Sequence, residues 1–497
     1  MSELSLKDKT IRGVGWSAAD TFLGKGITFL VGLVLARLLS PDEYGLIGIV
    51  TIFTTVLLGF VDCGFSSALI RKQKVSNDDY NTMFIVNLVV SVAMYALLFA
   101  ATPLIADFFE RPQLVHLIRV TGLLLIIQAL TIVQGTILSR NLDFKTKAKA
   151  SVFSAAASGA VGVAMAFAGC GVWSLVAQQL TRQFICSVYL WCYNRWIPCF
   201  SFRLESLRYM WGFGWKLMLS GFLDRFWAQL NQVVVGKFYS PATLGQYSRS
   251  KEFANIFSSN LTSVVQRVSY PVLSQVQDDK ARLTNGYRRI IKTTIFVSAV
   301  TMISMGAVAE PLIYCLIGPK WHEAATYLPL ICLNMSLYPL HAINLNMLQV
   351  QGRSDIFLIL EIIKKILAIG PLCLGIFVSV YWMLIGSLFF SVIVFFLNSF
   401  FSGRMLGYSS WRQLCDVAPS YGVAIAMALS VFFLKYLPLS FWLILPIQIV
   451  VGTSCFFLIC ESFKMPEYLE VKSIAKEYVG KIGQIMGSNS KHRNPSE

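Results

Sequence analysis

Charged residues are scarce in this chain. Asp, Glu, Lys and Arg make up 14% of its 497 residues, whereas a soluble domain carries about 25%. Hydrophobic residues account for 56%, and the mean hydropathy is +0.62. So few charges cannot cover a water-facing surface, and the apolar residues are spread along nearly the whole length. The composition therefore predicts an all-α polytopic membrane protein.

Several functional sequence patterns are also missing. Only four histidines occur, and no spacing with cysteine suits a metal ion, so we expect no metal site. Most of the 11 cysteines lie in apolar runs, where a thiol behaves as a small hydrophobic group. Gly24-Lys25 and Gly236-Lys237 lack both the upstream glycine and the following Ser or Thr of a phosphate-binding loop. ATP hydrolysis and a bound cofactor are therefore not expected.

Apolar runs long enough to cross a bilayer, about 20 residues each, recur along the chain. Fourteen spans are predicted, at 12–38, 43–69, 81–108, 113–139, 148–168, 172–194, 208–237, 243–269, 286–317, 323–350, 355–378, 381–403, 413–435 and 441–462. With the N-terminus inside, Lys and Arg gather in alternate loops, as they do on the cytoplasmic side of membrane proteins. Both termini are therefore predicted to be cytoplasmic, in a multi-pass membrane protein.

The net charge of +16 comes largely from these loop cations. Cations in short loops set the orientation of the spans and meet the anionic headgroups of membrane lipids. Membrane lipids are therefore expected partners, and nucleic acid is not.

A short phrase occurs twice in the sequence. Ser40-Pro41 and Gly45 recur as Ser240-Pro241 and Gly245, and three further matches lie in the same order along the chain at an offset of about 200 to 208 residues. Six spans separate the copies, so the two halves have parallel topology, as in transporters built from parallel repeats. The sequence therefore predicts two parallel six-helix lobes plus two C-terminal helices.

The predicted divisions follow from this repeat. They are an N-lobe at 1–194, a cytoplasmic linker at 195–207, a C-lobe at 208–403, helices 13 and 14 within 404–462, and a cytoplasmic tail at 463–497. The tail is expected to contain an amphipathic helix over 466–486 on the membrane surface, followed by a disordered end.

Some charges lie inside predicted spans, where each costs roughly 2.5–3.5 kcal/mol unless it faces protein or water. They are Asp20 and Lys25 in span 1, Asp224 and Arg225 in span 7, Arg249, Lys251 and Glu252 in span 8, and Glu361, Lys364 and Lys365 in span 11. The repeat offset places Lys25 level with Asp224 and Arg225. Intrahelical pairing at i,i+3 is one explanation for Arg249–Glu252 and Glu361–Lys364. The other is an ionic, mainly cationic cavity that binds an anion.

Several segments carry a family resemblance. LARLLSPDEYG (35–45), GCGVWSLVAQQL (169–180), VGKFYSPATLGQYSRS (235–250), QRVSYPVLSQVQDD (266–279) and AEPLIYCLIGPKW (309–321) closely resemble bacterial polysaccharide flippases of the Wzx type. The resemblance implies the superfamily of the MATE multidrug antiporters and the lipid II flippase, with alternating access. It further implies transport of undecaprenyl-pyrophosphate-linked oligosaccharide repeat units across the bacterial inner membrane for O-antigen, capsule or exopolysaccharide synthesis.

The resemblance also suggests roles for the charges. Pyrophosphate or sugar contact is assigned to Lys25, Arg225, Arg249, Lys251, Lys364 and Lys365. Orientation of these cations, or coupling to H+ or Na+, is assigned to Asp20, Asp224, Glu252 and Glu361. Many relatives have an acid where this chain has Asn231-Gln232, which argues against acid-based coupling at that point. Other polysaccharide assembly proteins are further expected partners.

Two alternatives stay open. A MATE-type cation-coupled drug antiporter predicts an acidic cavity, which the cationic bias disfavours. A polytopic polysaccharide polymerase or ligase predicts a sizeable outside loop with catalytic residues, and the predicted outside turns are only a few residues long. We therefore expect a transporter and not an enzyme.

Overall fold

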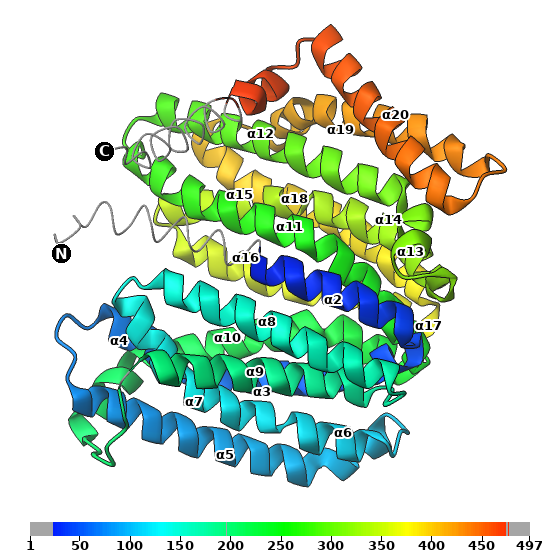
Figure 1. The fold of residues 1–497 in the computed structure, drawn as a ribbon. Coiled ribbons are helices and arrows are strands. Elements are labelled where there is room, and N and C mark those ends of the chain that lie inside the picture. The colour runs from blue at the N-terminus through cyan, green and yellow to red at the C-terminus, as the bar shows by residue number, and fades with distance from the viewer. Residues whose placement is uncertain (1–22, 195, 474–475, 477–497) are drawn as a thin grey trace, which may run out of the picture. The chain divides into compact units, whose positions relative to one another are not determined.

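Helices form all the regular secondary structure in the part of the chain that the structure describes (Figure 1). The structure is a computed structural model, and it describes residues 23–194, 196–473 and 476. The chain forms two compact units, residues 1–248 and 249–497. The predicted all-α class is confirmed.

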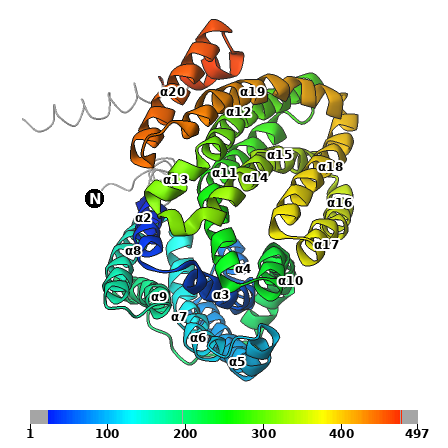
Figure 2. The same ribbon diagram turned by 90° about the vertical axis from the view of Figure 1, so that its right-hand side faces the viewer.

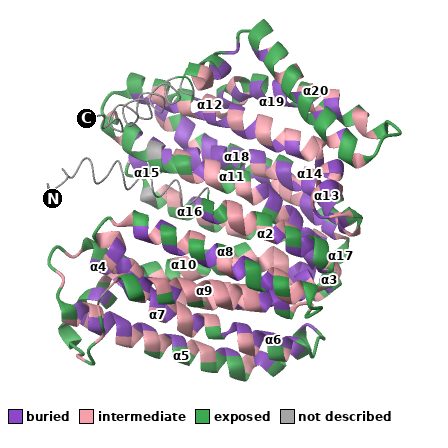
Figure 3. Cartoon of the chain, in the orientation of Figure 1, coloured by how far each residue is buried: buried purple, intermediate pink, exposed green. Residues whose placement is uncertain are grey.

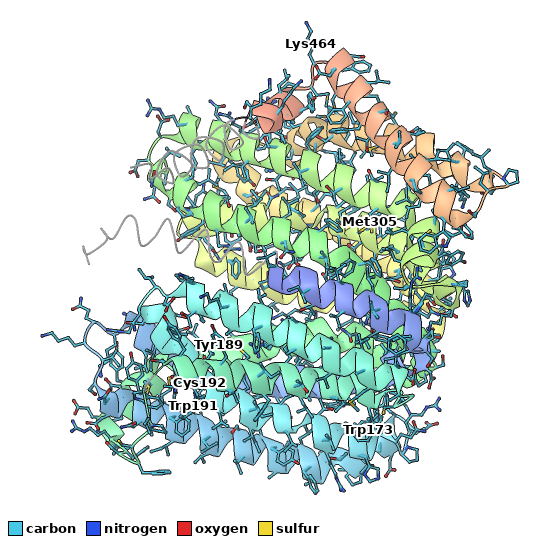
Figure 4. All side chains as sticks on the ribbon, in the orientation of Figure 1. Trp173, Tyr189, Trp191, Cys192, Met305 and Lys464 are labelled. Carbon is cyan, nitrogen blue, oxygen red and sulfur yellow. The ribbon has the colours of Figure 1, made fainter. Side chains whose placement is uncertain are left out.

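The first unit is a bundle of long helices. They are α2 (Lys25–Leu38), α3 (Pro41–Val61), α4 (Phe65–Arg71), α5 (Asn77–Phe108), α6 (Leu114–Thr121), α7 (Leu123–Arg140), α8 (Phe144–Phe167), α9 (Trp173–Tyr193), α10 (Leu204–Phe238) and the start of α11 (Pro241–Gln275). In Figure 1, α8, α9, α7 and α5 lie side by side, and α8 also packs against α2. The indole of Trp191, labelled in Figure 4, donates to the Leu130 carbonyl at 2.9 Å and ties α9 to α7.

The other face of this bundle is formed by α3 and α10. These two helices pack along each other, and α10 also contacts α4 and α5. The first compact unit thus includes the seventh predicted span. The lobe boundary at 195–207 stays a prediction, because it was drawn from the repeat and not from packing.

The predicted linker at 195–207 is partly helical. Residues 196–203 have no regular structure, and α10 begins at Leu204. The amide of Cys199 donates to the Asn81 side chain at 3.0 Å, and Arg203 pairs with Asp78 at 2.7 Å. These contacts hold the segment against the first turns of α5.

The second unit contains the rest of α11 and the remaining helices. They are α12 (Lys280–Ala307), α13 (Ala309–Leu316), η2 (Pro319–Trp321), α14 (His322–Ser336), α15 (Tyr338–Val350), α16 (Ser354–Leu367), α17 (Ile369–Phe377), α18 (Val380–Leu406), α19 (Ser410–Phe432), η3 (Phe433–Tyr436) and α20 (Phe441–Ser462). Figures 1 and 2 both show α12, α19 and α20 side by side, and α16 and α17 lie along α18.

Buried polar side chains join the helices of the second unit. Tyr287 of α12 donates to the Asn344 side-chain oxygen at 2.6 Å, and the Asn344 amide donates to Gln413 of α19 at 3.3 Å. Ser402 of α18 donates to the same Asn344 oxygen at 2.6 Å. Hydrogen bonds of this kind hold membrane helices together where lipid gives no hydrophobic drive.

Nine helices of the described residues are long and apolar enough to cross a membrane. They are Pro41–Arg71, Asn77–Phe108, Leu114–Arg140, Phe144–Phe167, Lys280–Ala307, Pro319–Val350, Val380–Leu406, Ser410–Tyr436 and Phe441–Ser462. The surface of α20 in particular suits lipid, since only 22% of its most apolar 18-residue segment is buried inside the protein (Figure 3). The chain is a multi-pass membrane protein, and the total of fourteen spans stays a prediction.

The helices outside this set include those that carry the predicted charges. The described parts of α2 and α16 have only 14 residues each, whereas α10 and α11 have 35 each and contain the charged positions. The described parts of α2 and α16 are thus too short for the set, and α10 and α11 are long enough but contain the charged positions of the predicted site.

Helix starts follow local sequence signals. Ser40 and Glu43 form a capping box at the start of α3, and Ser76 and Asp79 form another at the start of α5. Pro41 occupies the first turn of α3, where its missing N–H costs little. Each cap satisfies amide groups that would otherwise lack partners.

The two copies of the repeated phrase contact each other within the first unit. A Cβ added to Gly45 would lie 1.7 Å from the Pro241 carbonyl oxygen, and one added to Gly245 would lie 2.0 Å from the Pro41 oxygen. The contact is reciprocal, since each glycine meets the proline of the other copy. The glycines recur because two helix starts cross at backbone distance.

The C-terminal segment packs against the second unit. After a turn at Lys464 (Figure 4), residues 466–473 are helical, and Glu467 pairs with Lys292 at 2.7 Å. Glu470 pairs with Arg289 at 2.5 Å, and Tyr468 is buried against aromatic rings of α20. This part of the predicted amphipathic helix has α12 and α20 as partners. Positions 474–475 and 477–497 lie outside the described residues.

Alanine at Gly45 or Gly245 should destabilise the protein. The added methyl group forces α3 and α11 apart, so we expect the unfolding midpoint in detergent to fall by about 4 °C or more. Gly221→Ala on α10 is the matched control, because no atom lies within 4 Å of its Cβ position. Helix propensity there favours alanine by about 1 kcal/mol. Equal midpoints for Gly45→Ala and Gly221→Ala would contradict the close crossing.

Charge reversal at Glu467 should release the C-terminal helix. Glu467→Lys replaces the partner of Lys292 with a like charge, so trypsin should cleave after Lys472 about fivefold faster or more. The swap Lys292→Glu with Glu467→Lys restores the pair and should restore protection. Unchanged cleavage in the single variant would show that the ion pair does not hold the segment.

Candidate substrate-binding site

Two predicted charges on α11 pair with each other. The Nη1 atom of Arg249 lies 2.7 Å from Oε2 of Glu252, three residues later on the helix. The Arg249 side chain is 8% exposed and that of Glu252 is 46% exposed. The sequence offered intrahelical pairing as one explanation for these charges, and that pair is present. Lys251, which lies between Arg249 and Glu252 in the sequence, is half-buried. Ligand contact by these three residues stays a prediction.

The predicted charges on α16 also include a pair. The Lys364 ammonium contacts the Glu361 carboxylate one turn away, and their side chains are 13% and 29% exposed. Lys365 is half-buried beside them. Lys364 also interacts electrostatically with His341 of α15, whose Nε2 lies 2.9 Å from Oγ of Ser391 on α18. Sequence reasoning did not single out this histidine.

The remaining predicted charges belong to the first unit. Arg225 is exposed on α10, and its Nη1 lies 3.5 Å from the position of a Cβ added to Gly59 of α3. It also interacts electrostatically with Asp62, which accepts hydrogen bonds from Ser66. The Arg225 side chain therefore lies against α3 near the end of that helix.

Lys25 and Asp224 lie on different helices of that unit. Lys25 is exposed at the start of α2, which packs on α8, and Asp224 is exposed beside Arg225 on α10. Asp20 lies outside the described residues. The depth match between Lys25 and Arg225 stays a prediction.

A polar pocket in the second unit was not predicted. It has a volume of about 570 Å³ and lies between α11, α15 and α16. From α11 it receives Ser263, Gln266, Arg267 and Tyr270, and from the other two helices it receives Leu345, Asn346, Gln349 and Phe357. No residue of this described lining is Asp or Glu. The pocket offers one cation, two aromatic rings and several hydrogen-bonding groups.

A sequence signal for this pocket exists. Positions 263, 266, 267 and 270 have the i, i+3, i+4, i+7 spacing of one helix face. All four are polar or amphipathic, the first three lie in the predicted span 243–269, and Tyr270 directly follows it. A polar stripe on a membrane helix faces protein or water. The segment QRVSYPVLSQVQDD contributed to the family resemblance, but the partner helices α15 and α16 become known only from the tertiary structure.

The apolar helices, long enough to cross a bilayer, define a multi-pass membrane protein. The comparisons specify the family. The family described as polysaccharide biosynthesis protein matches residues 34–326, which is more than half of the chain. The chain belongs to this family.

Named relatives agree. The succinoglycan biosynthesis transport protein ExoT of Rhizobium meliloti (strain 1021) is 28% identical over 330 residues, covering 66% of this chain and 67% of ExoT. The lipopolysaccharide biosynthesis protein WzxC of Escherichia coli (strain K12) is 21% identical over 374 residues, covering 75% and 76% of the two chains. The Wzx-type resemblance is confirmed.

Solved structures show the same fold. The lipid II flippase MurJ in its inward closed conformation matches with a TM-score of 0.70 and 14% identity, over 90% of this chain and 98% of MurJ. An inward-facing MATE family multidrug resistance transporter matches with a TM-score of 0.60 and 15% identity, over 80% and 99% of the two chains. The fold is therefore MATE-like, and the protein is a membrane transporter of the polysaccharide biosynthesis family.

The pair on α16 can be tested by removing one or both partners. Glu361→Leu leaves a largely buried ammonium without its carboxylate and should cost about 2–3 kcal/mol of stability, less than a fully buried pair. The double variant Glu361→Leu/Lys364→Met removes both charges and should recover most of the loss in thermal unfolding. Normal export by the double variant would show that the pair only supports packing, and lost export would assign it to the substrate.

Proposed function

We propose that this protein translocates undecaprenyl-pyrophosphate-linked oligosaccharide repeat units across the bacterial inner membrane by alternating access. The translocated repeat units would serve the synthesis of a surface polysaccharide, such as O-antigen, capsule or exopolysaccharide. The observation that carries the proposal is the family match over residues 34–326 in a chain whose charged helices contain more cations than acids.

The names of the similar proteins support the cargo. ExoT is a transport protein of succinoglycan biosynthesis, WzxC belongs to lipopolysaccharide biosynthesis, and MurJ is a flippase for lipid II. A lipid-linked saccharide has a tail that stays in lipid and a headgroup that must pass the apolar core. The headgroup is anionic, so its passage requires cations that replace water.

The predicted cations suit this task. In the proposal, Lys25, Arg225, Arg249, Lys251, Lys364 and Lys365 contact the pyrophosphate or the sugars, and Asp20, Asp224, Glu252 and Glu361 orient them. Arg249 and Lys364 already contact carboxylates of their own helices. A substrate pyrophosphate would compete with those carboxylates, and such exchange allows binding without permanent trapping.

The drug antiporter fits less well. A cationic drug needs acids to bind it, whereas the described lining of the pocket between α11, α15 and α16 contains Arg267 and no carboxylate.

The proposal also places both termini in the cytoplasm, in keeping with the loop charges.

The proposal can be tested in a deletion strain of the source bacterium. The deletion should accumulate lipid-linked repeat units on the cytoplasmic side, and the wild-type gene should restore surface polysaccharide. Lys25→Ala and Arg225→Ala should restore about tenfold less at normal membrane levels, because each removes a cation that meets the pyrophosphate.

Lys237→Ala is a matched control on α10. Lys237 lies at the end of that helix and pairs with Glu110 at 2.8 Å, which lowers the pKa of the Glu110 carboxyl. This variant should export normally. A deletion strain without accumulated lipid-linked units would refute the function, and normal export by both alanine variants would refute the cationic route.

A further inference from the structure

The pocket between α11, α15 and α16 has the size and chemistry of a ligand site. Its volume of about 570 Å³ lies within the range of about 300–1,000 Å³ found for small-molecule sites. Most of its lining residues carry a polar group, and none of the described candidate charges assigned from the sequence belongs to it.

Arg267 is the charged group of this pocket. Its Nε donates to the Ser263 carbonyl at 3.1 Å, which fixes the side chain along α11. Within the described residues its two terminal nitrogens make no hydrogen bond, and no ion pair involves it. A guanidinium binds a planar anion through two parallel hydrogen bonds, and a carboxylate has the matching shape. The pocket therefore presents a prepared anion contact.

Aromatic rings and amides surround this cation. Tyr270 lies one turn from Arg267 on α11, and Phe357 of α16 lines the same pocket. Gln266 and Gln349 supply amides that can both donate and accept, and Asn346 is held by a 3.3 Å hydrogen bond to Ser269. A pyranose ring needs this combination, because its C–H face packs on an aromatic ring while its hydroxyls hydrogen-bond at the edge.

We propose that this pocket is a carbohydrate subsite that binds a pyranose ring bearing an anionic group, such as a uronic acid. Tyr270 packs against the ring, the amides of Gln266 and Gln349 hydrogen-bond its hydroxyls, and Arg267 binds the anion. The inference rests on the proposed function, since the sugar would belong to the transported repeat unit.

The place of the pocket in the sequence supports a loading role. Arg267, Gln349 and Phe357 lie near the ends of predicted spans 8, 10 and 11 that face the cytoplasm. A repeat unit on the cytoplasmic leaflet would meet this pocket before crossing.

Other ligand classes fit the lining less well. An inorganic pyrophosphate carries several negative charges and would face a single guanidinium. An apolar drug would offer no hydrogen bonds to the amides of Gln266 and Gln349, which costs affinity. A sugar with one anionic group satisfies both the cation and the amides.

Binding can be measured with small probes on the purified full-length protein in detergent. Ligand-detected NMR titrations would compare methyl β-D-glucuronide, methyl β-D-glucoside and inorganic pyrophosphate. We expect the glucuronide to bind more tightly than the glucoside by about fivefold or more. Arg267→Gln should abolish this preference. Tyr270→Ala should weaken both sugars. The control variant Arg282→Gln removes a cation on α12 that pairs with Asp279. It should change the binding of neither sugar.

Three results would overturn the subsite. The first is equal binding of the two sugars, and the second is a preference for the glucuronide that Arg267→Gln does not change. The third is that pyrophosphate displaces the glucuronide and that Tyr270→Ala leaves the affinity for pyrophosphate unchanged. The last result would assign the anion contact to a phosphate and not to a sugar.

The deletion strain separates this inference from the proposed function. If the deletion accumulates lipid-linked units and the wild-type gene restores export, the function stands. Normal export by Arg267→Gln and Tyr270→Ala in that background would then refute the subsite alone. Loss of export by both variants at normal membrane levels, with Arg282→Gln unaffected, would support it.

Discussion

The arrangement of this protein depends on the cost of polar groups in lipid. Each charge or amide in a membrane helix must find a partner inside the protein or in water. Arg249 meets Glu252 within α11, and Lys364 meets Glu361 within α16. Asn344 joins α12, α18 and α19 through hydrogen bonds. The apolar helices then cover these groups, and the surface of α20 remains largely exposed for lipid. The same requirement that holds the helices together leaves polar faces where a saccharide headgroup can bind.

The repeated phrase links chain architecture to packing. Its prolines begin helices α3 and α11, and its glycines let the two helix starts cross at backbone distance. A residue with a side chain at either glycine would separate them. The repeat therefore serves packing as well as topology.

Two kinds of polar surface enter the proposals. The charged positions on α2, α10, α11 and α16 are proposed to contact a pyrophosphate, whereas the pocket with Arg267, Tyr270 and the two glutamines is proposed to bind a sugar. A lipid-linked oligosaccharide contains both groups on one molecule. Its polyprenyl tail requires no site, since lipid already dissolves it. If charges bind the pyrophosphate and amides bind the sugars, related transporters could keep the charges and vary the amides as their glycans differ.

The sequence by itself determined the membrane class and the family resemblance, and it offered the two i,i+3 pairs as one explanation for the charges on α11 and α16. These features are local, since composition, periodicity and spacing within one helix are enough to define them. Only the tertiary structure decided that Gly45 meets Pro241, that Arg225 lies over Gly59, and that Glu467 and Glu470 hold the C-terminal helix on α12. It also decided the pocket, because Arg267, Gln349 and Phe357 come from three helices. Contacts between distant segments depend on which helix faces meet, and a polar stripe on one helix does not name its partner.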